Sequence, residues 1–353
     1  MVDKSYKINT SEFLELASEA GSCIFDVRSE SEFVQGHIPN SISLPLLNNE
    51  QRHKVGLCYK TDGQQAAVDL GFQLVGPSFY NIIQRARQLS NNKKILLYCW
   101  RGGLRSNIMT WLLRTAGLEV YLLEGGYKSF RKAALECYSQ QRNYLCLSGK
   151  TGTGKTQLLE KLKENGQEIL HLESLASHKG SAFGGIEMPD QPTQEQFENN
   201  IADILLKIPT NHSVWFEHES RMIGKVRIPD ALYDKLCESA VVEIQMNRTL
   251  RIERILSEYG HFNKDILKEK TLILQKRMGP EQNKNALTCL EEGDTHGWAA
   301  ILLEYYDKAY TFSNEREGKR SKMELEYNGN NQKEVMEQLL IFASHQNYGR
   351  SKY

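Results

Sequence analysis

A glycine-rich string, GKTGTGKT, constrains the fold of this chain more than any other feature. It matches the pattern GxxxxGK[ST] through Gly149, Gly154, Lys155 and Thr156. An apolar run at residues 144–147 precedes the string and an amphipathic segment, TQLLEKLKENG, follows it, which is the strand–loop–helix context that the pattern requires. In that context the backbone N–H groups of the loop and the N-terminus of the helix bind phosphate oxygens. The string therefore predicts an α/β domain with a phosphate-binding loop.

The side chains of this loop indicate how phosphate is held. Lys155 supplies a point charge, and the hydroxyl of Thr156 is suited to ligate Mg²⁺. Glu217 ends the hydrophobic run SVWF, with Glu219 two residues later, so we expect Mg²⁺ at Thr156 and Glu217; a surface carboxylate without metal is the alternative. No motif specific for adenine or guanine is found, so the ligand need not be a nucleotide. The predicted phosphate-binding residues are Gly149, Gly152, Thr153, Gly154, Lys155 and Thr156.

A cysteine directly follows a second apolar strand, in the string LLYCWRGGLRS. The strand fixes Cys99, and the glycines after it let the loop curl so that backbone N–H groups converge on one point. A helix beginning near Arg105 and Ser106 adds the positive end of its dipole, and Arg101 and Arg105 add full charges. These features favour a thiolate and an oxyanion beside it, so we predict Cys99, Arg101 and Arg105 to be catalytic. The predicted backbone of this loop is Trp100, Gly102, Gly103 and Leu104.

The string DVRSESEFVQGHIPNSISLP, at residues 26–45, resembles the rhodanese domain, and the resemblance extends over roughly residues 8–132. In rhodaneses the loop cysteine accepts a sulfane sulfur or a related chalcogen and passes it on. The resemblance implies that Asp26 and Arg28 brace the loop. Many single-domain rhodaneses have a shorter loop; the CX5R spacing here is similar to that of cell-cycle dual-specificity phosphatases, and suits phosphate or selenophosphate.

Composition limits the number of domains, the location and the partners that the chain can have. The chain has 353 residues, enough for two domains, with 40% hydrophobic and 25% charged residues. No apolar stretch approaches the roughly 20 residues that span a bilayer, and the N-terminus lacks a signal-peptide core, so we expect a cytoplasmic protein and no membrane partner. Basic and acidic residues balance at 44 each, so composition neither supports nor excludes tRNA binding. A local basic run marks a candidate tRNA contact at Arg221, Lys225 and Arg227.

Strand and helix signals alternate twice along the chain, which predicts parallel sheets covered by helices. The expected fold is α/β: a rhodanese-like domain at 1–135, a P-loop NTPase-like domain at 136–263, and a mainly helical extension of it at 264–353. The tail beyond Asn314 is polar and charged, and we expect its last ten residues to be mobile.

Taken together, these strings resemble the tRNA 2-selenouridine synthases, which fuse a rhodanese domain to a P-loop domain. The resemblance rests on CWRGGLRS, LEGGYKSFR, GKTGTGKT and EHESRMIGKVRIP, on the insertion RHKVGLCYKTDGQQAAVDLGFQLV, and on EEGDTHGWAAILLEYYDKAY near the C-terminus. It covers nearly the full length of the chain.

The resemblance implies a reaction. The family converts 2-thiouridine at the tRNA wobble position to 2-selenouridine with selenophosphate, and transfers a geranyl group from geranyl diphosphate to the thiouridine sulfur. No tightly bound cofactor is implied, and Mg²⁺ is the expected ion. We hypothesise that Lys155 and Mg²⁺ stabilise the leaving diphosphate, and that Cys99 either carries selenium as a selenosulfide or activates selenophosphate.

Two other interpretations fit the motifs taken singly. The first is a CX5R phosphatase fused to a P-loop small-molecule kinase, which would hydrolyse aryl phosphates and turn over nucleotide. The second is a nucleotide-switched binding module with an inactive rhodanese domain; the intact Cys99 loop argues against it.

Overall fold

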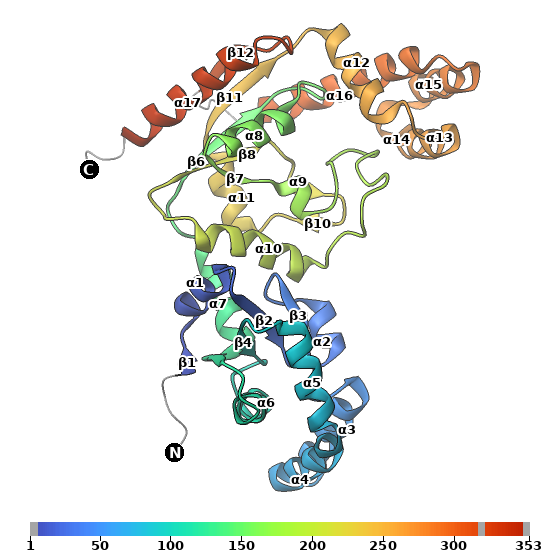
Figure 1. Cartoon of the computed structure of the whole chain (residues 1–353). Coiled ribbons are helices and arrows are strands. Elements are labelled where there is room, and N and C mark those ends of the chain that lie inside the picture. The colour runs from blue at the N-terminus through green and yellow to red at the C-terminus, as the bar shows by residue number, and fades with distance from the viewer. Residues whose placement is uncertain (1–5, 317–321, 349–353) are drawn as a thin grey trace. The chain divides into compact units, whose positions relative to one another are not determined.

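The computed structural model describes residues 6–316 and 322–348. The chain divides into two compact units (Figure 1). Unit 1 comprises Met1–Tyr138 and Thr193–Lys207, and unit 2 comprises Ser139–Pro192 and Ile208–Tyr353. The segment 193–207 therefore belongs to unit 1, although it lies in the sequence range expected for the P-loop domain.

A five-stranded parallel sheet forms the centre of unit 1. Its strands, in spatial order, are β1 (Lys7–Ile8), β5 (Val120–Leu123), β4 (Lys94–Tyr98), β2 (Ser22–Asp26) and β3 (Ser41–Ser43). The four residues at the end of β4, Ile95 to Tyr98, are fully buried, because helices cover both faces of a parallel sheet. Because the strand is buried on both faces, its sequence is a continuous apolar run.

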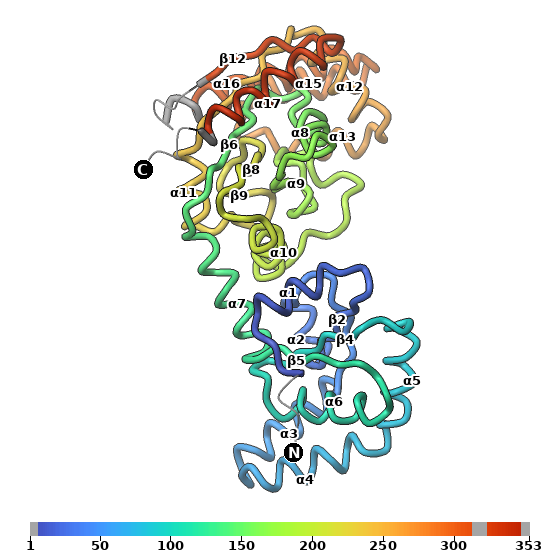
Figure 2. Tube along the Cα trace, turned by 60° about the vertical axis from the view of Figure 1, so that its left-hand side comes forward, coloured from blue at the N-terminus to red at the C-terminus, as the bar shows by residue number. Residues whose placement is uncertain are grey.

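Helices cover this sheet on two sides. Helices α1 (Thr10–Ser18) and α7 (Gly126–Cys137) pack together on one face, and α5 (Phe79–Ser90) and α6 (Leu104–Thr115) pack together on the other. Four further helices complete the unit: α2 (Glu30–Gln35), α3 (Asn49–Thr61), α4 (Gly63–Val75) and α10 (Gln194–Lys207). Helices α3 and α4 form an antiparallel pair, visible in Figure 2, and α10 packs on α7.

A second five-stranded parallel sheet forms the centre of unit 2. Its strands, in spatial order, are β12 (Lys322–Glu326), β11 (Ala240–Gln245), β6 (Asn143–Ser148), β8 (Ser213–Glu217) and β7 (Glu168–Leu170). A separate antiparallel hairpin joins β9 (Met222–Ile223) and β10 (Val226–Arg227). Because parallel strands end at the same sheet edge, the loops after β6 and β8 meet there.

The helices of unit 2 fall into two groups. Helices α8 (Lys155–Glu164) and α17 (Gln332–Tyr348) cover one face of the sheet, and α11 (Asp230–Cys237) packs on β6 from the other. The short α9 (Leu172–Leu175) follows β7. A helical subdomain with its own core around Trp298 contains α12 (Arg248–Tyr259), α13 (Lys264–Ile273), α14 (Gln275–Met278), α15 (Pro280–Glu292) and α16 (Thr295–Arg316).

The structure confirms the predicted α/β class, with a parallel-sheet unit followed by a second parallel-sheet unit that has a helical C-terminal part. The segment beyond Asn314, which the sequence predicted to be a polar tail, also contains a strand and a helix. Strand β12 pairs in parallel with β11, and helix α17 packs on α8. Of the ten terminal residues predicted to be mobile, 349–353 lie outside the described residues. Within the described parts of the chain, no helix has the length and apolar character needed to cross a bilayer.

Candidate active sites

Cys99 lies immediately after β4 and is 3% exposed. Its Sγ is 3.1 Å from the Oγ of Ser106, a fully buried residue of α6. The Ser106 hydroxyl also lies within hydrogen-bond distance of the Gly103 carbonyl, 3.0 Å away. A hydroxyl has one proton to donate, so Ser106 can donate either to Gly103 or to the sulfur. Ser106 was expected only as part of the helix start, and the structure adds it to the thiol site.

The loop after Cys99 is fixed by backbone contacts with the start of α7. The N–H of Tyr127 donates to the Cys99 carbonyl at 2.8 Å, and the N–H of Lys128 donates to the Trp100 carbonyl at 3.0 Å. A Cβ at Gly126, where φ is +61°, would overlap the Cys99 carbonyl oxygen. Only glycine permits this close approach. Gly126 lies in the string LEGGYKSFR, but the sequence alone did not predict that this glycine contacts the thiol loop.

The two loop arginines have different surroundings. Arg101 is exposed. Arg105 makes a two-bond ion pair with Glu32 of α2: Nη1 lies 2.6 Å from Oε2, and Nη2 lies 3.2 Å from Oε1. Burial alone would raise the pKa of the Glu32 carboxyl, but the hydrogen bonds and charge of Arg105 hold that pKa below its ordinary value. An oxyanion that binds Arg105 must therefore compete with Glu32.

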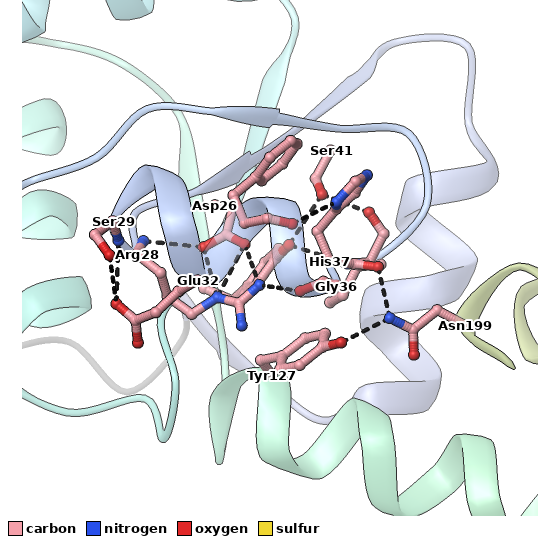
Figure 3. A network of polar contacts seen from close by, with 12 residues as sticks. Asp26, Arg28, Ser29, Glu32, Gly36, His37, Ser41, Tyr127 and Asn199 are labelled. Carbon is pink, nitrogen blue, oxygen red and sulfur yellow. Dashed lines mark hydrogen bonds and ion pairs between the residues drawn. The ribbon is translucent and has the colours of Figure 1, made fainter. Parts of the chain in front are cut away.

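A buried ion pair lies next to Tyr127, the residue whose N–H binds the Cys99 carbonyl, and Figure 3 shows its contacts. Arg28 Nη2 lies 2.6 Å from Asp26 Oδ2, and both side chains are at most 1% exposed. The same Nη2 donates to the Gly36 carbonyl at 2.6 Å, and the guanidinium stacks 4.0 Å from the centre of the Tyr127 ring. Asn199 of α10 donates to the Tyr127 hydroxyl at 2.6 Å. These contacts fit the bracing role that the rhodanese resemblance implies for Asp26 and Arg28.

The glycine-rich loop of unit 2 has the backbone shape that the sequence predicts. Gly149, Gly152 and Gly154 all have positive φ, at 145°, 81° and 81°. A Cβ at Gly149 would lie 2.7 Å from the Ile244 carbonyl oxygen, so the loop tolerates no side chain there. Helix α8 begins at Lys155, whose Nζ donates to the Gly149 carbonyl at 2.8 Å. The ammonium group is thus held over the loop where a phosphate would be bound.

Three carboxylates gather beside this loop. Glu217 ends β8, and its Oε2 accepts a hydrogen bond from Thr156 Oγ1 at 3.3 Å. Its other oxygen, Oε1, is buried without a hydrogen-bond partner. Glu173 and Glu219 each place a carboxylate oxygen so close that the three ligand atoms lie within 4.8 Å of one another. Thr156 and Glu217, the predicted magnesium ligands, are therefore adjacent, and Glu173 and Glu219 extend the set of oxygen ligands.

Crowding of these carboxylates changes their proton affinity. Burial, together with the charges of Glu217 and Glu219, raises the pKa of Glu173 to about 10. Burial and the charge of Glu217 raise the pKa of Glu219 to about 7. Burial also raises the pKa of Glu217, although the nearby Lys155 ammonium opposes that shift. The cluster therefore retains protons at neutral pH, and a divalent cation would displace them.

The loop and the carboxylates open into a cavity of about 960 Å³. Its polar lining contains Lys155 and the carboxylate cluster. Its lining also includes apolar residues, Phe183 from the segment after α9 and Trp298, Leu302 and Tyr306 from α16. A ligand with an anionic end and an apolar body matches this lining.

Two arginines of α12 lie against the loop. Arg251 is 3% exposed; its Nε donates to the Thr151 carbonyl at 2.8 Å, and its Nη2 lies 2.5 Å from Asp307. Arg254 lines the cavity, and a Cβ at Gly154 would lie 2.8 Å from its guanidinium carbon. Arg251 thus fixes the loop, while Arg254 brings a positive charge to it.

The predicted tRNA contacts lie on and beside the β9–β10 hairpin. Lys225 is exposed in its turn. Arg227 Nη2 lies 2.7 Å from Asp230 Oδ1. Arg221 Nη2 lies 3.4 Å from Asp234 Oδ1, and the guanidinium stacks 4.8 Å from the Tyr233 ring. The structure therefore brings Arg221 and Arg227 together at Asp230, pairs both arginines with carboxylates, and leaves Lys225 exposed in the hairpin turn.

Comparison with known families finds one family model for each unit, although the model that matches unit 2 also includes the segment 193–207 of unit 1. The profile "tRNA 2-selenouridine synthase AAA domain" matches residues 142–342, and the profile "Rhodanese-like domain" matches residues 9–133. The two matches include the phosphate-binding loop and the Cys99 loop, respectively.

Several curated proteins named tRNA 2-selenouridine synthase are similar to this chain. The protein of Nitrosomonas europaea is 38% identical over 68% of this chain and 64% of its own length, so the match spans less than two thirds of that relative. The protein of Marinobacter nauticus is 33% identical over 82% of this chain and 87% of its own length. The protein of Shewanella oneidensis is 33% identical over 85% of this chain and 88% of its own length. The chain therefore belongs to the tRNA 2-selenouridine synthase family of enzymes.

Proposed function

We propose that this chain converts 2-thiouridine at the tRNA wobble position to 2-selenouridine in two steps, one at each loop. The first step transfers a geranyl group from geranyl diphosphate to the thiouridine sulfur. The second replaces the S-geranyl group with selenium from selenophosphate. The observation that supports this proposal best is the cavity of unit 2, whose lining combines a phosphate-binding loop, a carboxylate cluster and a set of apolar side chains.

Geranyl diphosphate has the two chemical parts that this cavity accommodates. Its diphosphate would bind the backbone amides of the loop and Lys155, and Mg²⁺ would be held by Thr156, Glu217 and the neighbouring carboxylates. The geranyl chain would lie against the apolar residues of the lining, which include Phe183 and Trp298. During transfer, the carbon–oxygen bond to diphosphate breaks, the sulfur–carbon bond forms and the base loses its N3 proton. Positive charges at the loop stabilise the diphosphate as it leaves.

S-Alkylation prepares the base for the selenium step. A thiocarbonyl sulfur is a poor leaving group, whereas an S-alkyl group departs as a thiolate from an electrophilic carbon. Water cleaves the P–Se bond of selenophosphate and releases phosphate and hydrogen selenide. The selenide adds at C2, the C2–S bond breaks with its electron pair leaving on sulfur, and the selenide proton moves to N3. We assign this step to Cys99 and the amide-rich loop around it, with Arg101 and Arg105 as the cations for an oxyanion.

Nucleoside analysis tests this function directly. The protein is incubated with tRNA that carries a wobble 2-thiouridine, together with geranyl diphosphate, selenophosphate and Mg²⁺, and the digested nucleosides are weighed by mass spectrometry. We expect S-geranyl-2-thiouridine when selenophosphate is omitted and 2-selenouridine when it is present. Unmodified 2-thiouridine in both reactions, with folded protein and active substrates, would contradict the proposal.

A further inference from the structure

A second cavity, of about 280 Å³, lies in unit 1 beside the thiol loop. Two of its lining residues, Leu104 and Arg105, begin helix α6 and belong to the loop that follows Cys99. Ser106, whose Oγ is 3.1 Å from the Cys99 sulfur, comes directly after them. The cavity therefore reaches the segment that shapes the thiol site.

The cavity is apolar because of the helix pair α3–α4. On α4 the lining residues recur at helical spacing, so one face of the helix supplies Ala67, Val68, Gly71 and Val75. The loop after β3 adds Leu46 and Leu47, and α5 adds Phe79. The main charge in the lining is the Arg105 guanidinium, which is paired with Glu32. The charged part of the lining thus belongs to the thiol loop, while most of the remaining lining is hydrocarbon.

We infer that this cavity binds the geranyl chain of the S-geranyl nucleoside during the selenium step, an assignment that rests on the proposed function. The mainly hydrocarbon lining suits an alkyl chain, and the Arg105 guanidinium suits a polar group at the place where that chain is attached. The proposed substrate of unit 1 carries that chain on the sulfur that must leave. Burial of the chain in this cavity would bring the adjoining C2–S bond close to Leu104 and Arg105, and so to the Cys99 loop.

This arrangement also gives a reason for selectivity. An apolar cavity of this size favours a long alkyl group over a short one, because each buried methylene adds to binding. The selenium step should therefore act on S-geranyl-2-thiouridine in preference to S-methyl-2-thiouridine, although both offer a thiolate leaving group at the same carbon. Unmodified 2-thiouridine, without an alkyl chain, would be excluded from the step.

A cavity-filling variant tests the inference. Gly71 lines the cavity from α4, and a Cβ placed there meets no atom within 4 Å. Gly71→Leu should therefore fill part of the cavity without disturbing its walls. Gln73→Leu is the matched control, because it adds a leucine to the exposed surface of the same helix. The wild type and both full-length variants are given selenophosphate and tRNA that already carries either an S-geranyl or an S-methyl group, and kcat/KM for 2-selenouridine formation is measured. A separate reaction with 2-thiouridine tRNA and geranyl diphosphate measures geranylation by the same three proteins.

The wild type and Gln73→Leu should use the S-geranyl tRNA at least about tenfold better than the S-methyl tRNA. Gly71→Leu should lose about tenfold on the S-geranyl tRNA, retain the S-methyl rate and still geranylate 2-thiouridine. Equal use of both tRNAs by the wild type, or an equal loss on both in Gly71→Leu, would overturn the assignment. Absence of S-geranyl product from the wild type would instead contradict the proposed function, so the two failures are distinguishable.

Discussion

Arg105 and Glu32 form a two-bond ion pair at the thiol loop, with nitrogen–oxygen distances of 2.6 and 3.2 Å. Both side chains are about one-fifth exposed, at 20% and 21%, so an incoming anion has access to the pair. The loop arginine is therefore held in place before any substrate binds, and Glu32 competes with the substrate for it.

Glu32→Gln should increase the affinity of the thiol loop for phosphate or selenophosphate. The substitution removes the carboxylate that neutralises Arg105 and keeps a side chain of the same size. We expect oxyanion affinity to rise about threefold to tenfold, which corresponds to about 0.7–1.4 kcal/mol. Protection of Cys99 against alkylation by added phosphate gives the measurement, and Glu15→Gln on the exposed side of α1 is the control. Unchanged protection would show that Arg105 does not bind the anion.

Asp26→Asn should strongly destabilise unit 1. The change leaves the Arg28 guanidinium, 1% exposed, without its charge partner in the interior. Loss of one member of a buried pair costs about 3–5 kcal/mol, whereas loss of an exposed pair costs at most about 1 kcal/mol. Urea unfolding followed by circular dichroism measures the effect, and Glu19→Gln, which breaks the exposed pair with Lys94, is the control. Equal, small losses in the two variants would contradict the bracing role of Asp26.

Binding of Mg²⁺ should strengthen as pH rises through about 7, the pKa to which burial and the Glu217 charge raise Glu219. Both Glu219 and Glu173 have a folded-state pKa above the unfolded value, so the stability they contribute without metal is present at acid pH and lost as pH rises. Mg²⁺ replaces the protons and restores that stability. The rise in Tm caused by Mg²⁺ should therefore be larger at about pH 8.5 than at about pH 6.

Glu219→Gln should make the rise in Tm caused by Mg²⁺ less dependent on pH, because an amide neither titrates nor offers a charge to the ion. Glu164→Gln, on the exposed end of α8, should leave it unchanged. A Tm shift in the wild type that is independent of pH would mean that the cluster does not exchange protons for the cation.

Alanine at Arg221, Lys225 and Arg227 together should reduce the salt dependence of tRNA binding. Contacts between cations and phosphate release counterions, so each lost contact lowers the slope of log K against log salt. Asp230 and Asp234 pair with the two arginines, so Lys225 should contribute most and Lys225→Ala should account for most of the loss. A filter-binding series over salt concentration measures the slope. An unchanged slope in the triple variant would exclude this surface from tRNA binding.

The sequence was sufficient to predict the centres of both sheets. Strands β4 and β8 are buried on both faces, so they appear as uninterrupted apolar runs. Strand β12, with the sequence KMELE, alternates apolar and charged residues at a sheet edge, and such a short polar segment gives no comparable signal. Its pairing with β11 depends on contacts that only the folded chain brings together.

The same limit applies to the sites. Both loops could be predicted because their chemistry lies in consecutive residues. Glu173 could not, since it approaches Glu217 only through the order of strands β7 and β8. The contact of Asn199 with Tyr127 spans 72 positions and places α10 in unit 1, where no local pattern would assign it.

The central claim is that geranylation requires the loop of Lys155 and selenation requires Cys99. The most direct measurement supplies Cys99→Ser and Lys155→Ala with 2-thiouridine tRNA and all co-substrates, and separately with tRNA that is already S-geranylated. We predict that Cys99→Ser accumulates S-geranyl-2-thiouridine and forms no 2-selenouridine, and that Lys155→Ala forms 2-selenouridine only from the S-geranylated tRNA. Loss of both activities in either folded variant, or geranylation that survives in Lys155→Ala, would contradict the assignment of one step to each loop.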